Sequence, residues 1–255
     1  MQFAILGSGS SGNATLAKST HTTVLVDAGL SARQLLSRAQ SLGADTIDAI
    51  LITHEHGDHI RGLKPLLKQR SIPIYASSAT AHVLRESGIQ ATWRTFEPGQ
   101  AFPIGDLTVQ SFSIQHDAVD PVGYVLRSAE KSLGLISDAG HVTQSVTQHL
   151  QGMNGLYLEA NYDDALLAAD TKRPWTIKQR ISSRHGHLSN VQAAELLENI
   201  SHASLRHVVL AHLSTDCNCR QIAMRTMQQV LTSKGLTQVT VNCATQDETC
   251  GWWDL

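Results

Sequence analysis

One short segment of the chain holds several side chains that could bind a metal ion. It reads AILITHEHGDHIRG, and its candidate ligands are His54, His56, Asp58 and His59. Imidazole and carboxylate groups suit zinc, manganese or iron. Four ligands within six residues exceed what one catalytic metal takes from so short a segment. Two adjacent metals that share them would explain the number, whereas a solvated polar loop would not explain this density behind a buried strand.

Further ligand types stand where other apolar runs end. His116 follows the run in FSIQHDAVDPVGY, Asp138 follows LGLIS, and His212 follows HVVLA. Each alone is more often a loop or capping residue than a ligand. Together with the first segment they form a coherent site, in which a carboxylate such as Asp138 can bridge two cations.

The elements that must position these residues follow from hydrophobic periodicity. Apolar runs predict strands at 2–6, 22–26, 48–53, 72–76, 107–114, 122–127, 132–137, 155–159, 206–211 and 237–242. Helical spacing predicts helices near 31–42, 59–70, 78–87, 142–150, 189–200 and 219–233. No linker separates them, so we expect one α/β domain over residues 1–255. Asp58 suits the first turn of its helix, where a carboxylate meets free N–H groups.

The glycine-rich loop GSGSSGN, Gly7–Asn13, contains the G-x-G-x-x-G pattern of dinucleotide-binding units. Asp27 even stands about 20 residues further on, as that fingerprint asks. The fingerprint also needs a helix between the two, but NATLAKSTHTTVLV has alternating and β-branched residues typical of strands, with a turn at 18–21. We therefore expect a strand meander, with the loop forming one wall of a metal cleft.

Composition indicates an ordinary soluble protein. The 255 residues are 42% hydrophobic and 16% charged, with a net charge of −2. No signal peptide and no apolar stretch of about 20 residues is present, so we expect a cytoplasmic protein without membrane contact. The cysteines are expected as reduced thiols, because their spacing matches no common zinc site. They are Cys217, Cys219, Cys243 and Cys250.

The pattern His-x-His-x-Asp-His, followed by His, Asp and His, resembles the metallo-β-lactamase-fold hydrolases. That family implies an αββα sandwich of two mixed sheets flanked by helices, with a two-metal site. The resemblance assigns His54, His56 and His116 to one metal, and Asp58, His59 and His212 to the other. Asp138 and a hydroxide would bridge them. Asp27 would accept the second N–H of a ligand imidazole.

Three further segments narrow the resemblance. LGSGSSGN, LEANYD and PWTIKQRISSRHGHLSN are similar to the YycJ/WalJ exonuclease subfamily, which implies 5′-to-3′ exonucleolytic DNA cleavage. The similarity extends over nearly the whole chain. One departure is HLSTDCNCR, where the subfamily usually has Asn-rich sequence. It leaves the local loop contacts and the role of Cys217 and Cys219 open.

Phosphodiester cleavage sets the expected roles. A hydroxide shared by two cations forms near neutral pH and can attack in line. The leaving oxygen needs a proton, for which His187 is the candidate, as general acid or as phosphate clamp, with Glu159 orienting it. Asp58, His187 and Glu159 are the expected catalytic residues. The Glu/His pair resembles that of tRNA 3′-processing enzymes; alternatively, His187 simply precedes the helix at Ser189.

Substrate contacts are less specified. A basic segment borders the expected site, with Trp175 available to stack on a base. Its cations are Lys172, Arg173, Lys178, Arg180 and Arg184. A charged helix face explains them equally well. The residues selected as substrate contacts are Ser10, Ser11, Asn13, Arg180 and Asn190.

The resulting hypothesis is a DNA exonuclease with two divalent cations, Zn²⁺ or Mn²⁺, with Fe as a further option. RNA as substrate, a small cyclic phosphodiester, a thioester and a lactone stay open as alternatives within the same fold. The chain lacks the helix that a dinucleotide-binding unit requires after its glycine-rich loop, which opposes that function. A structural zinc site would have a closed ligand set, whereas the ligands predicted here leave room for water. The sequence does not specify an oligomeric state; a homodimer is one alternative.

Overall fold

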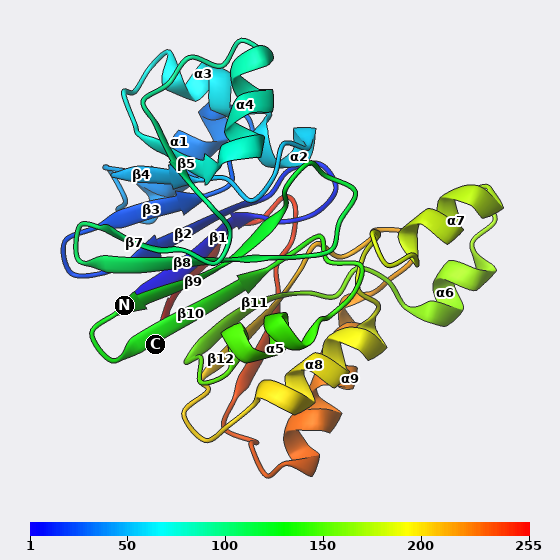
Figure 1. The fold of residues 1–255 in the computed structure, drawn as a ribbon. Coiled ribbons are helices and arrows are strands. Elements are labelled where there is room, and N and C mark those ends of the chain that lie inside the picture. The colour runs from blue at the N-terminus through cyan, green and yellow to red at the C-terminus, as the bar shows by residue number, and fades with distance from the viewer. The chain divides into compact units, whose positions relative to one another are not determined.

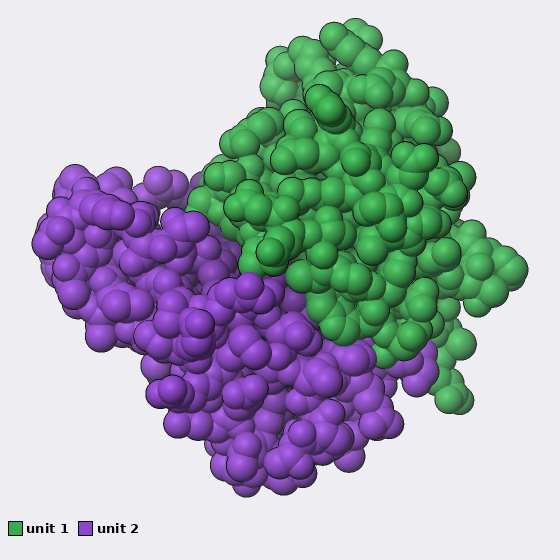
Figure 2. Space-filling view, turned by 180° about the vertical axis from the view of Figure 1, so that it is seen from behind, with its two compact units in different colours: residues 1–113, 118–130, 245–254 green, residues 114–117, 131–244, 255 purple.

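The structure, a computed structural model, describes residues 1–255 and divides the chain into two compact units. Unit 1 comprises residues 1–113, 118–130 and 245–254, and unit 2 comprises residues 114–117, 131–244 and 255. Figure 1 traces the elements along the chain, and Figure 2 colours the atoms by unit. The expectation of one domain over the whole chain stays a prediction.

Unit 1 is built on a seven-stranded sheet. In spatial order its strands are β14 (Cys250–Asp254), β1 (Gln2–Gly7), β2 (Ala14–Lys18), β3 (Thr23–Val26), β4 (Ala49–Leu51), β5 (Ile74–Ser77) and β6 (Trp93–Phe96). β1 runs through the glycine-rich loop directly into antiparallel β2, with no intervening helix. The strand meander that the sequence analysis expected at this loop is therefore confirmed.

The parallel pairing of β3 and β4 explains the positions of Asp27 and of the first predicted ligands. The two strands are parallel, with Val26 beside Leu51. Parallel neighbours end at the same edge of a sheet, so the residues that follow them, Asp27 and the segment from Thr53, begin side by side.

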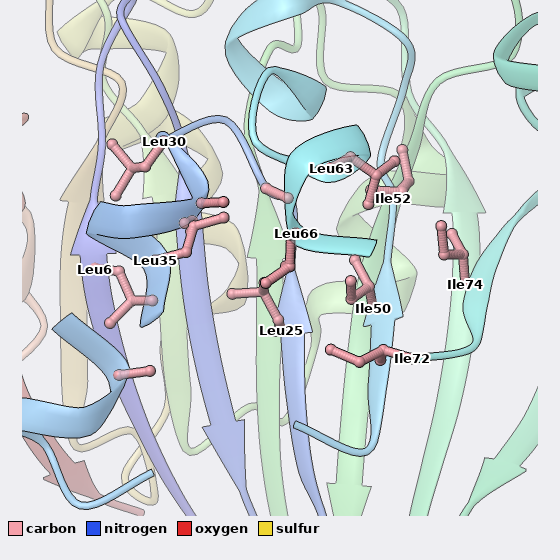
Figure 3. Packing of buried hydrophobic residues seen from close by; sticks show 14 of the residues in the cluster. Leu6, Leu25, Leu30, Leu35, Ile50, Ile52, Leu63, Leu66, Ile72 and Ile74 are labelled. Carbon is pink, nitrogen blue, oxygen red and sulfur yellow. The ribbon is translucent and has the colours of Figure 1, made fainter. Parts of the chain in front are cut away.

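Helices cover this sheet in unit 1. They are α1 (Ala32–Ser41), α2 (Gly57–Ile60), α3 (Leu63–Leu67) and α4 (Ser78–Glu86). The α1 helix begins with a capping box, in which Ser31 and Gln34 each bond the other's backbone N–H. Its Leu35 packs with Leu63 and Leu66 of α3 onto Leu25 and Ile50 of the sheet (Figure 3).

A second layer of unit 1 consists of antiparallel β7 (Ala101–Ile104), β8 (Leu107–Ser113) and β9 (Val122–Ser128). Aromatic rings link it to the first sheet. Phe102 stacks on Tyr75 with ring centroids 5.3 Å apart and on Phe96 at 4.9 Å. The fully buried Tyr124 donates its hydroxyl to the carbonyl of Ile52 at 2.6 Å.

Unit 2 contains four parallel strands. They are β10 (Lys131–Ile136), β11 (Gly155–Glu159), β12 (His207–Ala211) and β13 (Thr240–Cys243). In the register, Ile136 lies beside Leu158 and Glu159 beside Ala211. Asp138, Glu159 and His212 therefore emerge from one edge of these strands, which is where open α/β sheets bind ligands.

The helices of unit 2 fall into two groups. The first is α5 (Gln144–Leu150), α8 (Asn190–Ile200) and α9 (Arg220–Ser233). α8 packs against both α5 and α9, and α9 also packs against β13. The second is α6 (Asp164–Ala169) and α7 (Trp175–Ile181), which project beside them (Figure 1). Tyr162, Leu167, Ile181 and Cys217 form a small apolar cluster at the second group. No residue of α7 is buried.

Most predicted elements are confirmed within a few residues. The sequence analysis did not identify α6, α7, β6, β7 and β14, and it merged α2 and α3 into one helix. α2 and α3 separate at Gly62, whose N–H donates to the carbonyl of Ala28 rather than continuing the helix.

All four cysteines are free thiols. None of the helices has the length and apolar character that crossing a membrane requires.

Replacing Tyr124 by Phe tests the link between the layers of unit 1. The variant leaves the buried carbonyl of Ile52 without this donor, so the free energy of unfolding should fall by about 1–3 kcal/mol. Tyr75→Phe is the control, because no hydrogen bond of its hydroxyl is present, and it should change stability by less than about 0.5 kcal/mol. Urea unfolding of both variants measures the free energy of unfolding. An equal decrease in the two variants would contradict a stabilising role of the hydrogen bond between Tyr124 and Ile52.

Candidate metal centre

Asp27 positions residues 53–59 of unit 1, which contain the predicted ligands and are here named the ligand segment. Its carboxylate accepts hydrogen bonds from the Thr53 backbone N–H at 2.9 Å and from the Thr53 hydroxyl at 2.9 and 3.1 Å. It also contacts Nδ1 of His59 at 2.7 Å. A carboxylate at Nδ1 places the ring proton there and the lone pair at Nε2, the atom that would face a cation. The amide nitrogen of Asn13 lies 3.1 Å from that Nε2. Asp27 thus has the contact expected of a residue that orients a ligand imidazole.

The four predicted ligands of this segment lie close together. Ring nitrogens of His54 and His56 are within 4.8 Å of each other, as are a carboxylate oxygen of Asp58 and a ring nitrogen of His59. The rings of His54 and His59 have centroids 4.1 Å apart. Asp58 lies in the first turn of α2, as predicted.

Hydrogen bonds from the glycine-rich loop hold Asp58 in position. The N–H of Asn13 donates to the carbonyl of Asp58 at 2.8 Å, and the N–H of Gly29 donates to the carbonyl of Asn13 at 2.9 Å. The Asn13 amide donates to the Asp58 carboxylate at 3.2 Å, and its own oxygen accepts from the N–H of Gly9 at 3.0 Å. The opening loop therefore holds a predicted ligand in position.

Such close backbone approach requires glycine. A Cβ at Gly29 would lie 1.6 Å from the carbonyl oxygen of Asp58, and one at Gly12 would lie 2.6 Å from that of Gly29. No side chain fits at either position.

Glu55, within the HEHGDH segment, was not singled out by the sequence analysis. Its carboxylate accepts a hydrogen bond from the N–H of Val119 at 2.8 Å. The N–H of Val122 also donates to the carbonyl of Thr53 at 3.1 Å. These bonds fix the segment that leads into β9 against the ligand segment within unit 1.

In unit 2, His116 is positioned by the loop after α7. Its Nδ1 donates to the carbonyl of Gly186 at 3.0 Å, which places the lone pair of the ring at Nε2. Gly140 and Gly186 permit this approach, since a Cβ at Gly140 would lie 2.4 Å from the Gly186 nitrogen. Burial lowers the pKa of His116, which favours the neutral ring that metals bind.

Four side chains of unit 2 have ligand atoms within 4.8 Å of one another: Asp138, Glu159, His187 and His212. The fully buried Glu159 contacts Nδ1 of His187 at 2.7 Å and Nδ1 of His212 at 3.3 Å. Its second oxygen accepts from the N–H of Ala139 at 2.8 Å. The predicted Glu159/His187 pair is therefore in direct contact in the structure.

The pair perturbs its own titration. Burial would raise the pKa of Glu159, but the charge and hydrogen bond of His187 outweigh burial and lower it. For His187 burial acts downward, and the Glu159 carboxylate overcomes it and raises the pKa. The contact favours a protonated imidazole beside a carboxylate.

Backbone strain marks three of the site residues. Asp27, Asp138 and His212 have φ values of 60°, 57° and 52°. Residues other than glycine rarely adopt this left-handed conformation, which turns each side chain aside at the end of its strand. Asn161, from the LEANYD segment, stabilises the last turn, because its amide donates to the His212 carbonyl at 2.7 Å.

The residues selected as substrate contacts have different environments. Ser10 and Ser11 are exposed, and the Ser11 N–H bonds to the side chain of Gln246. Arg180 pairs with Asp117 at 2.5 Å. Asn190 is buried and exchanges amide hydrogen bonds with Asn218.

Comparison with known proteins identifies the family. A model described as Beta-lactamase superfamily domain matches residues 22–213. The chain belongs to the β-lactamase superfamily. It is 35% identical to exodeoxyribonuclease YycJ of Bacillus anthracis over 240 residues, which are 92% of this chain and 90% of that protein.

Solved structures agree with this superfamily assignment. The metallo-β-lactamase-fold protein YhfI of Bacillus subtilis superposes with a TM-score of 0.75 at 18% identity, over 99% of both chains. Zinc-bound PqqB of Methylobacterium extorquens superposes with a TM-score of 0.72 at 17% identity, over 100% of both chains. The predicted metallo-β-lactamase fold and the resemblance to YycJ are confirmed. This superfamily member is a metal-dependent hydrolase.

The contact between Asp27 and His59 predicts that a substitution of Asp27 weakens metal binding. Asp27→Asn removes the charge that holds the His59 proton at Nδ1, so metal affinity should fall about 10–100-fold. Asp48→Asn is the matched control, because Asp48 accepts a hydrogen bond from the Thr23 N–H at the opposite end of β3. Titration with a competing chelator measures both variants. Equal metal retention in the two would contradict the role of Asp27.

Proposed function

We propose that this protein is a metal-dependent phosphodiesterase that removes nucleotides from DNA, as a 5′-to-3′ exonuclease. The observation that carries the proposal is the contact of 2.7 Å between Glu159 and His187, beside Asp138. Protonation of a leaving oxygen requires an acid held in place by a third group, and this pair has that arrangement. Hydrolysis of a thioester or lactone would not need such a pair there.

The proposal assigns the metal ligands as the family resemblance does. His54, His56 and His116 would hold one divalent cation, zinc or manganese, and Asp58, His59 and His212 the other. Asp138 would bridge them. The donor set fits, because in His59 and His116 an oxygen acceptor at Nδ1 places the ring proton there and the lone pair at Nε2, the atom that would face a cation.

When bound, the cations would supply a hydroxide at neutral pH and neutralise charge on the phosphoryl group. The protein's own residues do the remainder. Asp27 and Asn13 hold His59 and Asp58 in position, and Glu159 aligns His187. His187 then delivers a proton to the leaving 3′ oxygen, or binds the phosphate as a clamp.

DNA as the substrate is supported by the relative. YycJ, named an exodeoxyribonuclease, aligns over nine-tenths of both chains. The residues of the proposed acid pair belong to LEANYD and RHGHLSN, two of the segments that carry the likeness to the subfamily.

His187→Ala separates the acid role from metal binding. Cleavage of 5′-labelled DNA should fall about 10²–10⁴-fold, because the 3′ alkoxide leaves poorly without a proton. Turnover of bis(p-nitrophenyl) phosphate should fall far less, since p-nitrophenolate leaves without protonation. His185→Ala, at the exposed histidine two residues before, is the control and should retain both activities.

The alternatives give different patterns in this assay. Equal losses on both substrates, with a raised KM, would identify His187 as a phosphate clamp. Unchanged DNA cleavage by His187→Ala would contradict the assignment of the pair. Turnover of the small ester with no DNA cleavage by the wild type would exclude the exonuclease and leave a small-molecule phosphodiesterase.

A further inference from the structure

Three of the five cations in the basic segment around α7, residues 172–184, form ion pairs with carboxylates of unit 2. Lys172 pairs with Asp216 at 2.5 Å, and Arg173 pairs with Asp170 at 2.9 Å and with Asp216 at 3.0 Å. Arg180 pairs with Asp117, as described above. Each of these cations thus has a carboxylate partner, and the segment offers less positive charge to a ligand than its sequence suggests.

Lys178 and Arg184 of this segment have no carboxylate partner; Lys178 donates to the carbonyl of Ala168. A second set of cations without such partners lies in unit 1, after the predicted ligands Asp58 and His59. Arg61, Lys64 and Lys68, here named the α3 cation row, follow Asp58 and His59 along α2 and α3 and are exposed. None of the three has an ion-pair partner; Arg61 donates only to the backbone carbonyl of Ser11 at 2.8 Å.

Lys64 and Lys68 stand four residues apart at α3 and therefore share one helix face, about 5–6 Å from each other. Arg61 precedes them, at the end of α2 and before the break at Gly62. Leu63 and Leu66 occupy the opposite face and are buried against the sheet (Figure 3). The row therefore leads away from the ligands Asp58 and His59 along the exposed surface of unit 1.

An open groove accompanies the row. It has a volume of about 520 Å³ and is lined by Lys64, Leu67, Lys68, Gly88 and Gln90. Gly88 contributes no side chain, and Gln90 adds an amide to the two ammonium groups. Ammonium groups spaced along an open groove suit a chain of phosphates.

We propose that the α3 cation row is the surface along which the phosphate backbone of a single DNA strand lies. This inference rests on the proposed nuclease function and names the strand-binding surface of that same site. Successive phosphates would meet Arg61, Lys64 and Lys68 as the strand leaves the ligand segment.

Steady-state cleavage of a labelled single-stranded oligonucleotide, measured over roughly 50–200 mM salt, tests the proposal. Each phosphate contact to a single strand contributes about 0.7 to the slope of log(kcat/KM) against log[salt]. Lys64→Gln with Lys68→Gln should make that slope shallower by about 1.4 and raise KM roughly tenfold near 0.15 M salt, with kcat retained. Lys131→Gln with Lys234→Gln removes the same charge elsewhere and should leave KM and slope as in the wild type.

The competing surface is tested alongside. An unchanged slope in the Lys64/Lys68 variant, with the loss instead in Lys172→Gln with Lys178→Gln, would overturn the proposal in favour of α7. An unchanged slope in both variants would overturn it as well. In either case DNA cleavage by the wild type would keep the nuclease function. If the wild type turns over bis(p-nitrophenyl) phosphate but not DNA, the nuclease function fails, and the proposal fails with it.

Discussion

The carboxylate of Asp27 is the interaction on which the ligand segment of unit 1 depends. It stands at the end of β3 in a left-handed conformation and bonds to Thr53 and His59, while its own N–H donates to the carbonyl of Leu51 at 2.8 Å. One side chain thus joins two parallel strands to α2. Because it fixes the protonated nitrogen of His59, it also determines which nitrogen would face a cation in the proposed metal site.

The same design recurs in unit 2. Asp138 and His212 leave parallel strands in left-handed conformations, and Glu159 lies between them on β11. Strained turns of this kind cost about 1–3 kcal/mol each and persist only where the surroundings enforce them. Here the enforcing contacts include the Asn161 amide on His212 and the Ala139 N–H on Glu159. The strained backbone therefore occurs where predicted ligands follow the ends of separate strands.

Ligand types at the ends of apolar runs were predictable from the sequence, because strand period and residue chemistry are local properties. The contacts that hold them were harder to predict. Asn13 was expected to touch substrate, yet its amide bonds to Asp58; that role depends on Gly12 and Gly29 allowing two backbones to approach. Helices α6 and α7 were missed because they bury little apolar surface, and β6 and β7 because they are short and half exposed. In each case the deciding interaction is long-range.

The central proposal is that the predicted histidine and aspartate ligands serve a metal-dependent phosphodiesterase. Counting metals per chain in the purified protein, before and after chelation and reconstitution with Mn²⁺ or Zn²⁺, tests it most directly when DNA cleavage is followed in the same samples. The account predicts about two metals per chain, with cleavage lost on chelation and restored on reconstitution. A protein that binds no metal after reconstitution, or cleaves DNA equally well without it, would contradict the account.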